Sequence, residues 1–166
     1  MKRIGLLSDT HSFLPEAVFT HFNEVDEIWH AGDIGDVHTA NKLEMFKPLR
    51  AVYGNIDGHD LRLRYPEHLY FTIEHVSVLM MHIGGYPPKY NASSLDLIKK
   101  YKPHLFICGH SHILKVMPDA NHNLLHINPG ACGNHGWHKV STLIRFKVNN
   151  DRIQELEIIE LGKRGV

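Results

Sequence analysis

The sequence is short of residues that would stabilise it covalently or attach it to a membrane. Its 166 residues include only two cysteines, Cys108 and Cys132, with no CxxC pair. A disulfide framework and a four-thiolate zinc site are therefore excluded, and we expect a reducing, cytoplasmic compartment. The longest apolar stretches, such as Val76–Met81, fall far below the roughly 18 residues of a membrane helix. The apolar run near the amino terminus is too short for a secretion signal, because Ser8 and Asp9 interrupt it.

An excess of charge of either sign is also missing. Lys and Arg together number 18, as do Asp and Glu, so the formal net charge is zero. A neutral chain without a basic tract is not drawn to long nucleic acid or to acidic lipid, and we expect neither as a partner. Histidine, by contrast, is abundant, with 15 residues. Because neutral imidazole is the commonest metal ligand in proteins, the positions of these histidines raise the question of a metal site.

Length and composition are those of one ordinary globular domain. Hydrophobic residues make up 43% of the chain and charged residues 22%, close to the average of folded domains. We expect residues 1–166 to form a single domain, because domains usually have roughly 100 to 200 residues. A chain of this size buries enough surface to fold without disulfides or metal, so a bound metal would serve chemistry.

Apolar segments typical of strands alternate with helical patterns, which predicts an α/β (α+β) domain with a partly parallel sheet. The expected strands are 4–7, 27–29, 49–53, 69–73, 76–81, 105–108, 113–116, 124–127, 141–148 and 153–161. The expected helices are 15–22, 37–46 and 95–101, the last preceded by Ser93 and Asp96 at capping-box spacing. After Ile113 the strands follow one another without helices, so we expect that half to be antiparallel.

Polar side chains directly follow five of the expected strands. They are Asp9 and His11, then Asp33, Asn55, His82, and finally His110 with His112. Ligands of α/β sheets bind at the carboxyl ends of strands, so we expect these residues to converge on one site. Asp9 and His11 stand two apart, and in extended backbone such residues face the same way, so both can hold one ion. Imidazole with carboxylate suits zinc, manganese or iron better than magnesium or calcium.

These residues and their order resemble a known family, the calcineurin-like metallophosphoesterases, and within it the small single-domain phosphodiesterases of bacteria and archaea. The matching motifs are Asp9-Thr10-His11, Gly32-Asp33, Gly54-Asn55, His82 and Gly109-His110-Ser111-His112. The resemblance implies a four-layer αββα sandwich, in which two mixed β-sheets are flanked by helices, with two metal ions at the strand ends.

The resemblance also implies which residues bind each ion. Asp9, His11 and His112 would bind the first, Asn55, His82 and His110 the second, and Asp33 would bridge the two. Simple strand geometry would instead send His110 and His112 to the same ion, and here we follow the resemblance. The expected cofactors are two divalent transition-metal ions, manganese first, with nickel, iron or zinc as alternatives.

The activity implied is phosphoester hydrolysis by in-line attack of a metal-bridging hydroxide, with Asp33, Asn55 and Asp57 as catalytic residues. We expect small phosphodiesters as substrates, because a dianionic monoester would gain from cationic donors and none of the five motifs contains arginine. Many larger family members have histidine where this chain has Ile56. A proton for the leaving group must therefore come from elsewhere, with Asp57 and His59 as candidates, or from water.

Two other functions stay open. One is a non-catalytic scaffold of the same fold, like the retromer subunit whose metal site is degraded, although here all seven ligand positions are filled. The other is a phosphomonoesterase or a nuclease, because one metal core serves many phosphoester chemistries. The sequence does not decide between a monomer and a homo-oligomer. We interpret the loops 86–90 and 133–138 as connections between strands and not as substrate contacts.

Overall fold

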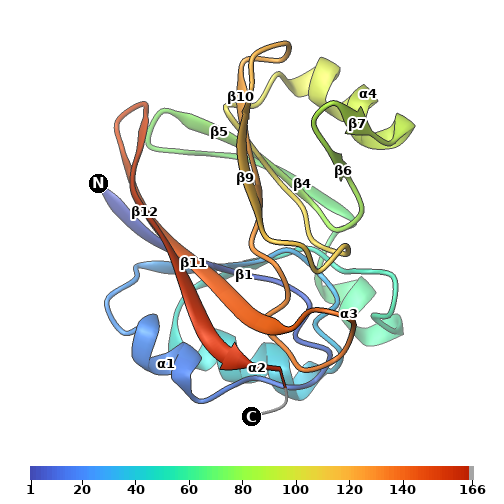
Figure 1. Ribbon diagram of the computed structural model, residues 1–166, viewed down its shortest axis with the longest axis vertical. Coiled ribbons are helices and arrows are strands. Elements are labelled where there is room, and N and C mark those ends of the chain that lie inside the picture. Colours follow the sequence, from blue (N-terminus) through green and yellow to red (C-terminus); the bar gives the residue numbers. More distant parts are fainter. Residues whose placement is uncertain (165–166) are drawn as a thin grey trace.

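The computed structural model describes residues 1–164, which form two β-sheets packed face to face between layers of helices (Figure 1). The first sheet runs in the order β12 (Arg152–Lys163), β11 (Val140–Asn149), β1 (Lys2–Leu7), β2 (Glu27–His30), β3 (Leu49–Ala51). The second runs in the order β4 (His68–Ile73), β5 (Val76–Met81), β8 (Leu105–Ile107), β10 (Leu124–Asn128), β9 (Lys115–Asp119). The predicted four-layer αββα sandwich is confirmed.

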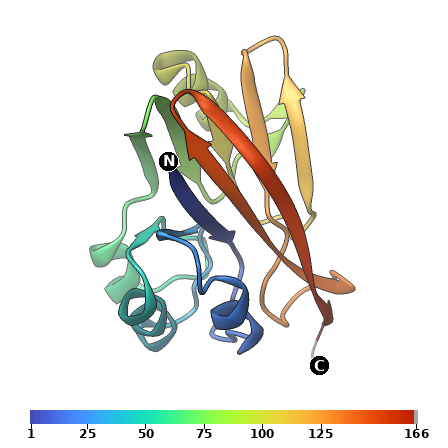
Figure 2. The same ribbon diagram turned by 90° about the vertical axis from the view of Figure 1, so that its left-hand side faces the viewer.

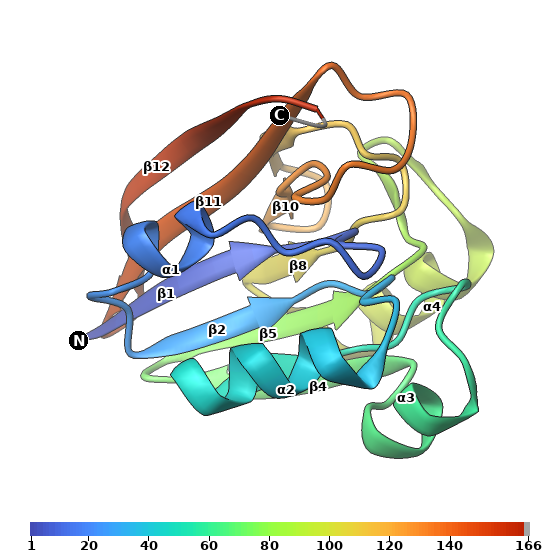
Figure 3. The ribbon, with the colours of Figure 1, turned by 90° about the horizontal axis from the view of Figure 1, so that it is seen from below.

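Helices cover the outer faces of both sheets. Helices α1 (Ala17–His21) and α2 (Val37–Phe46) lie against the first sheet, as Figure 3 shows from below, and α4 (Ala92–Tyr101) lies against the second. The short helix α3 (His59–Arg64) packs through Leu61 into a cluster that also contains residues of α2 and β3. Among residues 1–164, no helix has the length and apolar character needed to cross a membrane.

The alternation of side chains along each strand separates three apolar layers. In β5, Val78 and Met80 pack between the two sheets, whereas Leu79 and Met81 pack beneath α4. Successive residues of a strand point to opposite faces, and every residue of β5 is buried because both faces are covered. This two-sided burial explains why the strand is continuously apolar in sequence.

The parallel strands direct their carboxyl ends to one end of the sandwich. Strands β1, β2 and β3 are mutually parallel, as are β5, β8 and β10. In Figure 3 the arrowheads of β1, β2 and β5 point to the same side. The long hairpin of β11 and β12 continues the first sheet on the antiparallel side of β1, and in Figure 2 it is the orange-red and red pair of strands that leads to the C-terminus. The loops that follow the parallel strands therefore meet, as the sequence predicts.

Several local expectations were wrong. The second half is not wholly antiparallel, because β10 pairs parallel with β8. Helix α3 and the two-residue strands β6 (Gly85–Tyr86) and β7 (Lys89–Tyr90) were not expected, since elements so short show no periodicity. The amino-terminal cap of α4 is Asn91, whose side chain accepts a hydrogen bond from the Ser94 amide at 2.8 Å. Ser93 instead donates its hydroxyl to the Asn91 side chain.

Candidate metal centre

Asp9, in the loop after β1, presents one free carboxylate oxygen to three imidazoles. Its Oδ2 accepts hydrogen bonds from the Ser8 hydroxyl at 2.7 Å and from the His110 amide at 3.1 Å. Its Oδ1 is buried and has no hydrogen-bond partner among residues 1–164. It lies 3.1 Å from Nε2 of His112, 3.8 Å from Nε2 of His82 and 3.9 Å from Nε2 of His11. The ligand atoms of Asp9, His11 and His112 all lie within 4.8 Å of one another, close enough to hold one ion.

Asp33, in the loop after β2, faces imidazoles on two sides. Its Oδ1 accepts a hydrogen bond from the Ile56 amide at 3.0 Å, which orients the carboxylate. Its Oδ2 lies 3.2 Å from Nε2 of His82 and 3.4 Å from Nε2 of His11. His82 donates from Nδ1 to the Ala31 carbonyl at 2.8 Å, which leaves the lone pair of Nε2 directed at Asp33. Asp33 is therefore the carboxylate situated between the two sets of histidines.

His110 and His112, two residues apart, belong to different groups. His112 lies with Asp9 and His11, whereas His110 lies with Asp33 and His82. This is the division that the family resemblance implies, and not the one expected from strand geometry. The reason is visible in the backbone, because both histidines follow the end of β8 and have positive φ angles, 67° and 58°. Extended geometry, which would direct both side chains to the same ion, does not apply there.

The same explanation corrects the expectation for Asp9 and His11. Their φ angles are 54° and 45°, so they lie on left-handed turns and not on extended backbone. Asp33 also has a positive φ, 54°. Residues other than glycine rarely have positive φ angles, and a cluster of such residues commonly marks a functional site. The structure brings these residues together as predicted, but through strained turns.

Asn55 follows β3 and lies at the rim of the same site. Its side chain is exposed and lines the cavity that Asp33 and His110 also line, and a neighbouring cavity lined by His82. Gly54 makes this arrangement possible, because a Cβ there would lie 2.0 Å from Oδ1 of Asp33. No other residue type fits between the Asn55 turn and the Asp33 carboxylate.

The charges at the site, and its buried atoms without hydrogen-bond partners, suit metal binding. Burial raises the pKa of both Asp9 and Asp33, yet the neighbouring histidines hold both below their ordinary range. The Asp33 and Asp9 carboxylates raise the pKa of His11 to about 9. Three buried atoms, Oδ1 of Asp9 and Nε2 of His11 and His82, have no hydrogen-bond partner among the described residues. Imidazole nitrogens and carboxylate oxygens left free in this way are the donor set of divalent transition metals.

Asp57 has a different environment from the one expected of a catalytic acid. Its carboxylate is buried and accepts hydrogen bonds from the amides of Gly35 at 2.8 Å, Gly54 at 2.8 Å and Ile34 at 3.1 Å. These contacts tie the loop that carries Asp33 to the loop that carries Asn55. Because its oxygens are occupied by backbone donors, Asp57 is better suited to positioning these loops than to donating a proton.

Residues missed by the sequence reasoning complete the walls of the site. The loop 133–138, interpreted as a connection, places His135 on His11 with ring centroids 4.7 Å apart, and His138 against His112 at 5.4 Å. Two histidines beside a tryptophan in a glycine-rich segment are the signal that could have drawn attention to it. Arg62, on the unexpected helix α3, donates to the carbonyls of Asp57 and Asn55 at 2.7 and 3.2 Å and so supports the Asn55 turn.

A cavity of about 560 Å³ opens above these side chains. The residues that line it are His11, Asp33, Asn55, Ile56, His110, Ser111, His112, Ile113, His135, Gly136, Trp137 and His138. None of these described residues is Lys or Arg. Three apolar side chains at the rim are unusually exposed, namely Ile56 at 45%, Ile113 at 61% and Trp137 at 99%. The cavity thus combines a polar floor with an apolar rim.

Comparisons with known proteins identify relatives of this chain. Residues 1–151 match the calcineurin-like phosphoesterase superfamily domain. A probable metallophosphoesterase of Methanothermobacter thermautotrophicus is 33% identical over 135 residues, 77% of this chain and 76% of the relative. An archaeal phosphodiesterase superposes with a TM-score of 0.76 at 24% identity, covering 96% of this chain and 99% of the other.

Vps29 of Entamoeba histolytica, in a complex with Zn²⁺, has the same fold. It superposes with a TM-score of 0.75 at 15% identity, covering 95% of this chain and 98% of Vps29. At this identity the likeness concerns the fold alone. The family match over residues 1–151 and the archaeal relative go further, and they show that the chain belongs to the calcineurin-like phosphoesterase superfamily.

Proposed function

We propose that this protein hydrolyses small phosphodiesters with the help of two divalent metal ions held by the seven residues named from the sequence. The observation that carries the proposal is the position of Asp33 Oδ2, 3.2 Å from Nε2 of His82 and 3.4 Å from Nε2 of His11. One carboxylate is thereby shared between two groups of ligands. In this assignment Asp9, His11 and His112 hold one ion, Asn55, His82 and His110 hold the other, and Asp33 contacts both.

Two bound ions would supply Lewis-acid stabilisation of the phosphoryl oxygens and a water nucleophile active near neutral pH. The chain's own residues keep the ligands oriented for this purpose. The hydrogen bonds of Ser8 and Ile56 fix the two carboxylates, and the Ala31 carbonyl fixes the His82 tautomer. Manganese is the ion we expect first, because carboxylate, amide and imidazole ligands suit it, with nickel, iron and zinc as alternatives.

The preference for diesters rests on the cavity above the centre. A monoester dianion needs compensating cations, but the described residues that line this cavity include no Lys or Arg. The exposed side chains of Ile56, Ile113 and Trp137 at its rim favour contact with the organic groups that a diester carries on both sides. The volume, about 560 Å³, suits a small substrate.

A panel assay tests the proposal. Bis(p-nitrophenyl) phosphate and p-nitrophenyl phosphate are each offered with manganese, nickel, iron, zinc and magnesium, and the metal content of the reloaded protein is measured in parallel. We expect about two ions per chain and a higher kcat/KM for the diester. A higher kcat/KM for the monoester would overturn the substrate class, and a ceiling of one ion would overturn the two-metal assignment.

A non-catalytic scaffold is the second candidate, favoured by the similarity of the fold to Vps29. It predicts no hydrolysis of either ester with any of the five metals, even where two ions bind. The ligand set argues against it, because each of the seven positions holds a residue able to bind metal. The Asp33→Asn variant distinguishes true activity from a contaminating phosphatase, which would survive the substitution.

A further inference from the structure

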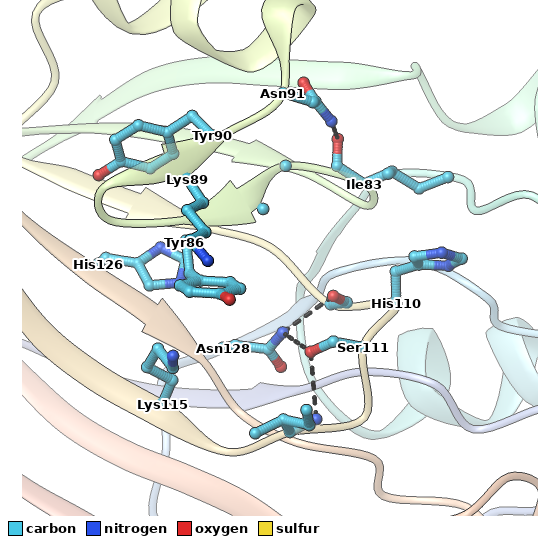
Figure 4. Close-up of a pocket in the computed structure, with 14 residues that line it drawn as sticks. Ile83, Tyr86, Lys89, Tyr90, Asn91, His110, Ser111, Lys115, His126 and Asn128 are labelled. Atoms are coloured by element: carbon cyan, nitrogen blue, oxygen red, sulfur yellow. Dashed lines mark hydrogen bonds between the residues drawn. The ribbon is translucent and has the colours of Figure 1, made fainter.

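A second cavity adjoins the proposed metal centre and shares one proposed ligand, His110, with it. It has a volume of about 400 Å³ and lies between the β6–β7 hairpin and strands β9 and β10. His110, Ser111 and Ile113 line both this cavity and the one above the metals. Figure 4 shows Tyr86, Lys115 and His126 on one side of it and His110 on the other. A group attached to a phosphate at the metals can therefore extend into this second cavity.

Aromatic and apolar side chains form much of its wall. Tyr86 and Tyr90 come from the hairpin, and Ile83 and Ile113 come from the loops after β5 and β8. Tyr86 is 39% exposed and Ile83 41%, so both retain apolar surface that a ligand can cover. Lys115 holds the Tyr86 ring in place, with Nζ 3.7 Å from the ring centroid. Such a wall suits a flat ring.

A histidine whose ring nitrogens lack hydrogen-bond partners lies buried at the floor of the cavity. His126 lines it, is 0% exposed, and has no hydrogen-bond partner for either Nδ1 or Nε2 among the described residues. Burial lowers the pKa of His126 to about 4, so near neutral pH the ring carries one N–H donor and one acceptor nitrogen. Polar groups buried without partners are rare in folded proteins, and those in a cavity wall point to a ligand with a matching edge.

The charge of the wall suits an anion beside the ring. Lys89 and Lys115 both line the cavity, and none of the described residues in the lining is Asp or Glu. A phosphodiester linked to the ring would therefore meet no opposing carboxylate in this wall. A ligand that fits this cavity therefore has a flat ring, a polar edge and an attached negative charge.

We propose that this cavity binds the base of a nucleoside phosphodiester whose phosphate lies at the metal centre, an inference that rests on the proposed phosphodiesterase function. Bases stack on aromatic side chains, with contributions equivalent to about 5- to 150-fold in affinity per base. On binding, the buried His126 ring turns a nitrogen toward the edge of the base, and this hydrogen bond makes a base bind more tightly than a plain aromatic ring.

Three diesters with the same leaving group test the proposal, namely the p-nitrophenyl esters of thymidine 5′-phosphate, phenyl phosphate and methyl phosphate. We expect kcat/KM to fall in that order, with about tenfold or more between thymidine and methyl. Tyr86→Ala should remove most of the preference for thymidine over methyl. His126→Phe, which keeps a ring but removes both nitrogens, should remove the preference for thymidine over phenyl.

The matched control is Tyr70→Ala. Tyr70 is also 39% exposed, but it lies on β4 and stacks on Tyr101, outside the lining of the cavity. The Tyr70→Ala substitution should leave kcat/KM unchanged for all three esters. A phenyl ester hydrolysed as efficiently as the thymidine ester, or an unchanged preference in Tyr86→Ala, would overturn the proposal while leaving the phosphodiesterase function intact.

A binding measurement separates the two proposals if none of the esters is hydrolysed. Thymidine is titrated into the metal-free protein, and the amide NMR signals of Gly84, Gly85 and Ser111, which line the cavity, are followed. Shifts at these amides that disappear in Tyr86→Ala would support base binding even where hydrolysis fails. No shift at roughly 10 mM thymidine, well above a Kd of about 1 mM, would overturn it.

Discussion

Asp33 is the side chain on which the proposed centre depends most, because its Oδ2 lies close to Nε2 of both His82 and His11. Asp33→Asn removes a negative charge from between the two ligand groups. We expect a loss of metal together with a fall in kcat by orders of magnitude, since activation of the nucleophile requires both ions. Metal analysis and kcat are measured on the same preparation.

Asp36→Asn is the control for this substitution. Asp36 caps the amino terminus of α2 by accepting from the Thr39 amide at 2.7 Å, and asparagine caps a helix equally well. This variant should keep both metals and its turnover. If Asp33→Asn behaved like it, with two metals and near-native kcat, Asp33 would not be the bridging ligand.

We expect Asp57 to position the loops of the site and not to donate the proton. In Asp57→Asn one of the two oxygens becomes an amide group that faces backbone N–H donors, so at least one buried donor loses its acceptor. We expect the free energy of unfolding to fall by about 1 to 3 kcal/mol, with kcat lowered and two metals retained. Urea unfolding and a pH–rate profile check this. A profile that lost one of its limbs would instead identify Asp57 as the proton donor.

His30 makes the metal-free protein sensitive to mild acid. It is fully buried, its Nδ1 accepts from the Gly32 amide at 3.1 Å, and burial lowers its pKa to about 4. The unfolded chain, with a histidine pKa near 6.5, then binds more protons between about pH 6.5 and 4. Stability should therefore fall as the pH drops through this window, by on the order of 3 kcal/mol from His30.

Urea unfolding of the chelated protein at several pH values measures this loss. His30→Gln should reduce the slope without abolishing it, because the amide does not titrate but the buried His126, whose pKa burial also lowers to about 4, still contributes in the same window. The exposed His38 serves as the control, and His38→Gln should leave the slope unchanged. An equally steep slope in His30→Gln would show that His30 does not contribute to the acid sensitivity.

The loop 133–138 depends on one glycine for its approach to the site. Gly136 has a φ of +119°, and a Cβ there would lie 2.2 Å from Nδ1 of His112. Gly136→Ala should displace His112 from Asp9, lower the metal content by about one ion per chain and reduce kcat at least about tenfold. Metal analysis and steady-state kinetics measure both effects.

Gly162, near the end of β12, provides a close match for this test. Its φ is +109°, and a Cβ added there would meet no atom within 4 Å. Gly162→Ala therefore carries a similar backbone strain without displacing a ligand. It should lose some stability but keep both metals. Equal loss of metal in the two variants would mean that strain, and not contact with His112, is responsible.

The whole molecule should keep its fold without metal. Its three apolar layers, two outside the sheets and one between them, are built from buried side chains that do not depend on the ligand residues. Chelation should abolish hydrolysis while the far-UV circular dichroism stays native. Metal added at 100 times its Kd should then raise the free energy of unfolding by about 2.7 kcal/mol. Loss of the circular dichroism signal on chelation would contradict this.

The amino-acid sequence by itself determines the core and the order of the polar motifs. Because β5 is buried on both faces, it must be continuously apolar, and the residue pattern alone indicates such a strand. Helix α2 has the bounds that the sequence predicts, Val37–Phe46, because Asp36 begins it and Pro48 follows it. Placing Asp9, Asp33, Asn55, His82 and His110 directly after strands is sufficient to bring them to one end of the sandwich.

Tertiary structure alone decided the division of ligands and the second cavity. The turns that separate His110 from His112 depend on positive φ angles, which no side-chain pattern encodes. Tyr86 and His126, 40 residues apart, line the same cavity only because the β6–β7 hairpin lies over β10. The alternation of apolar and polar residues indicates which face of a strand is buried. It does not indicate which distant loop lies beside that strand, because the position of such a loop depends on how the completed sheets pack.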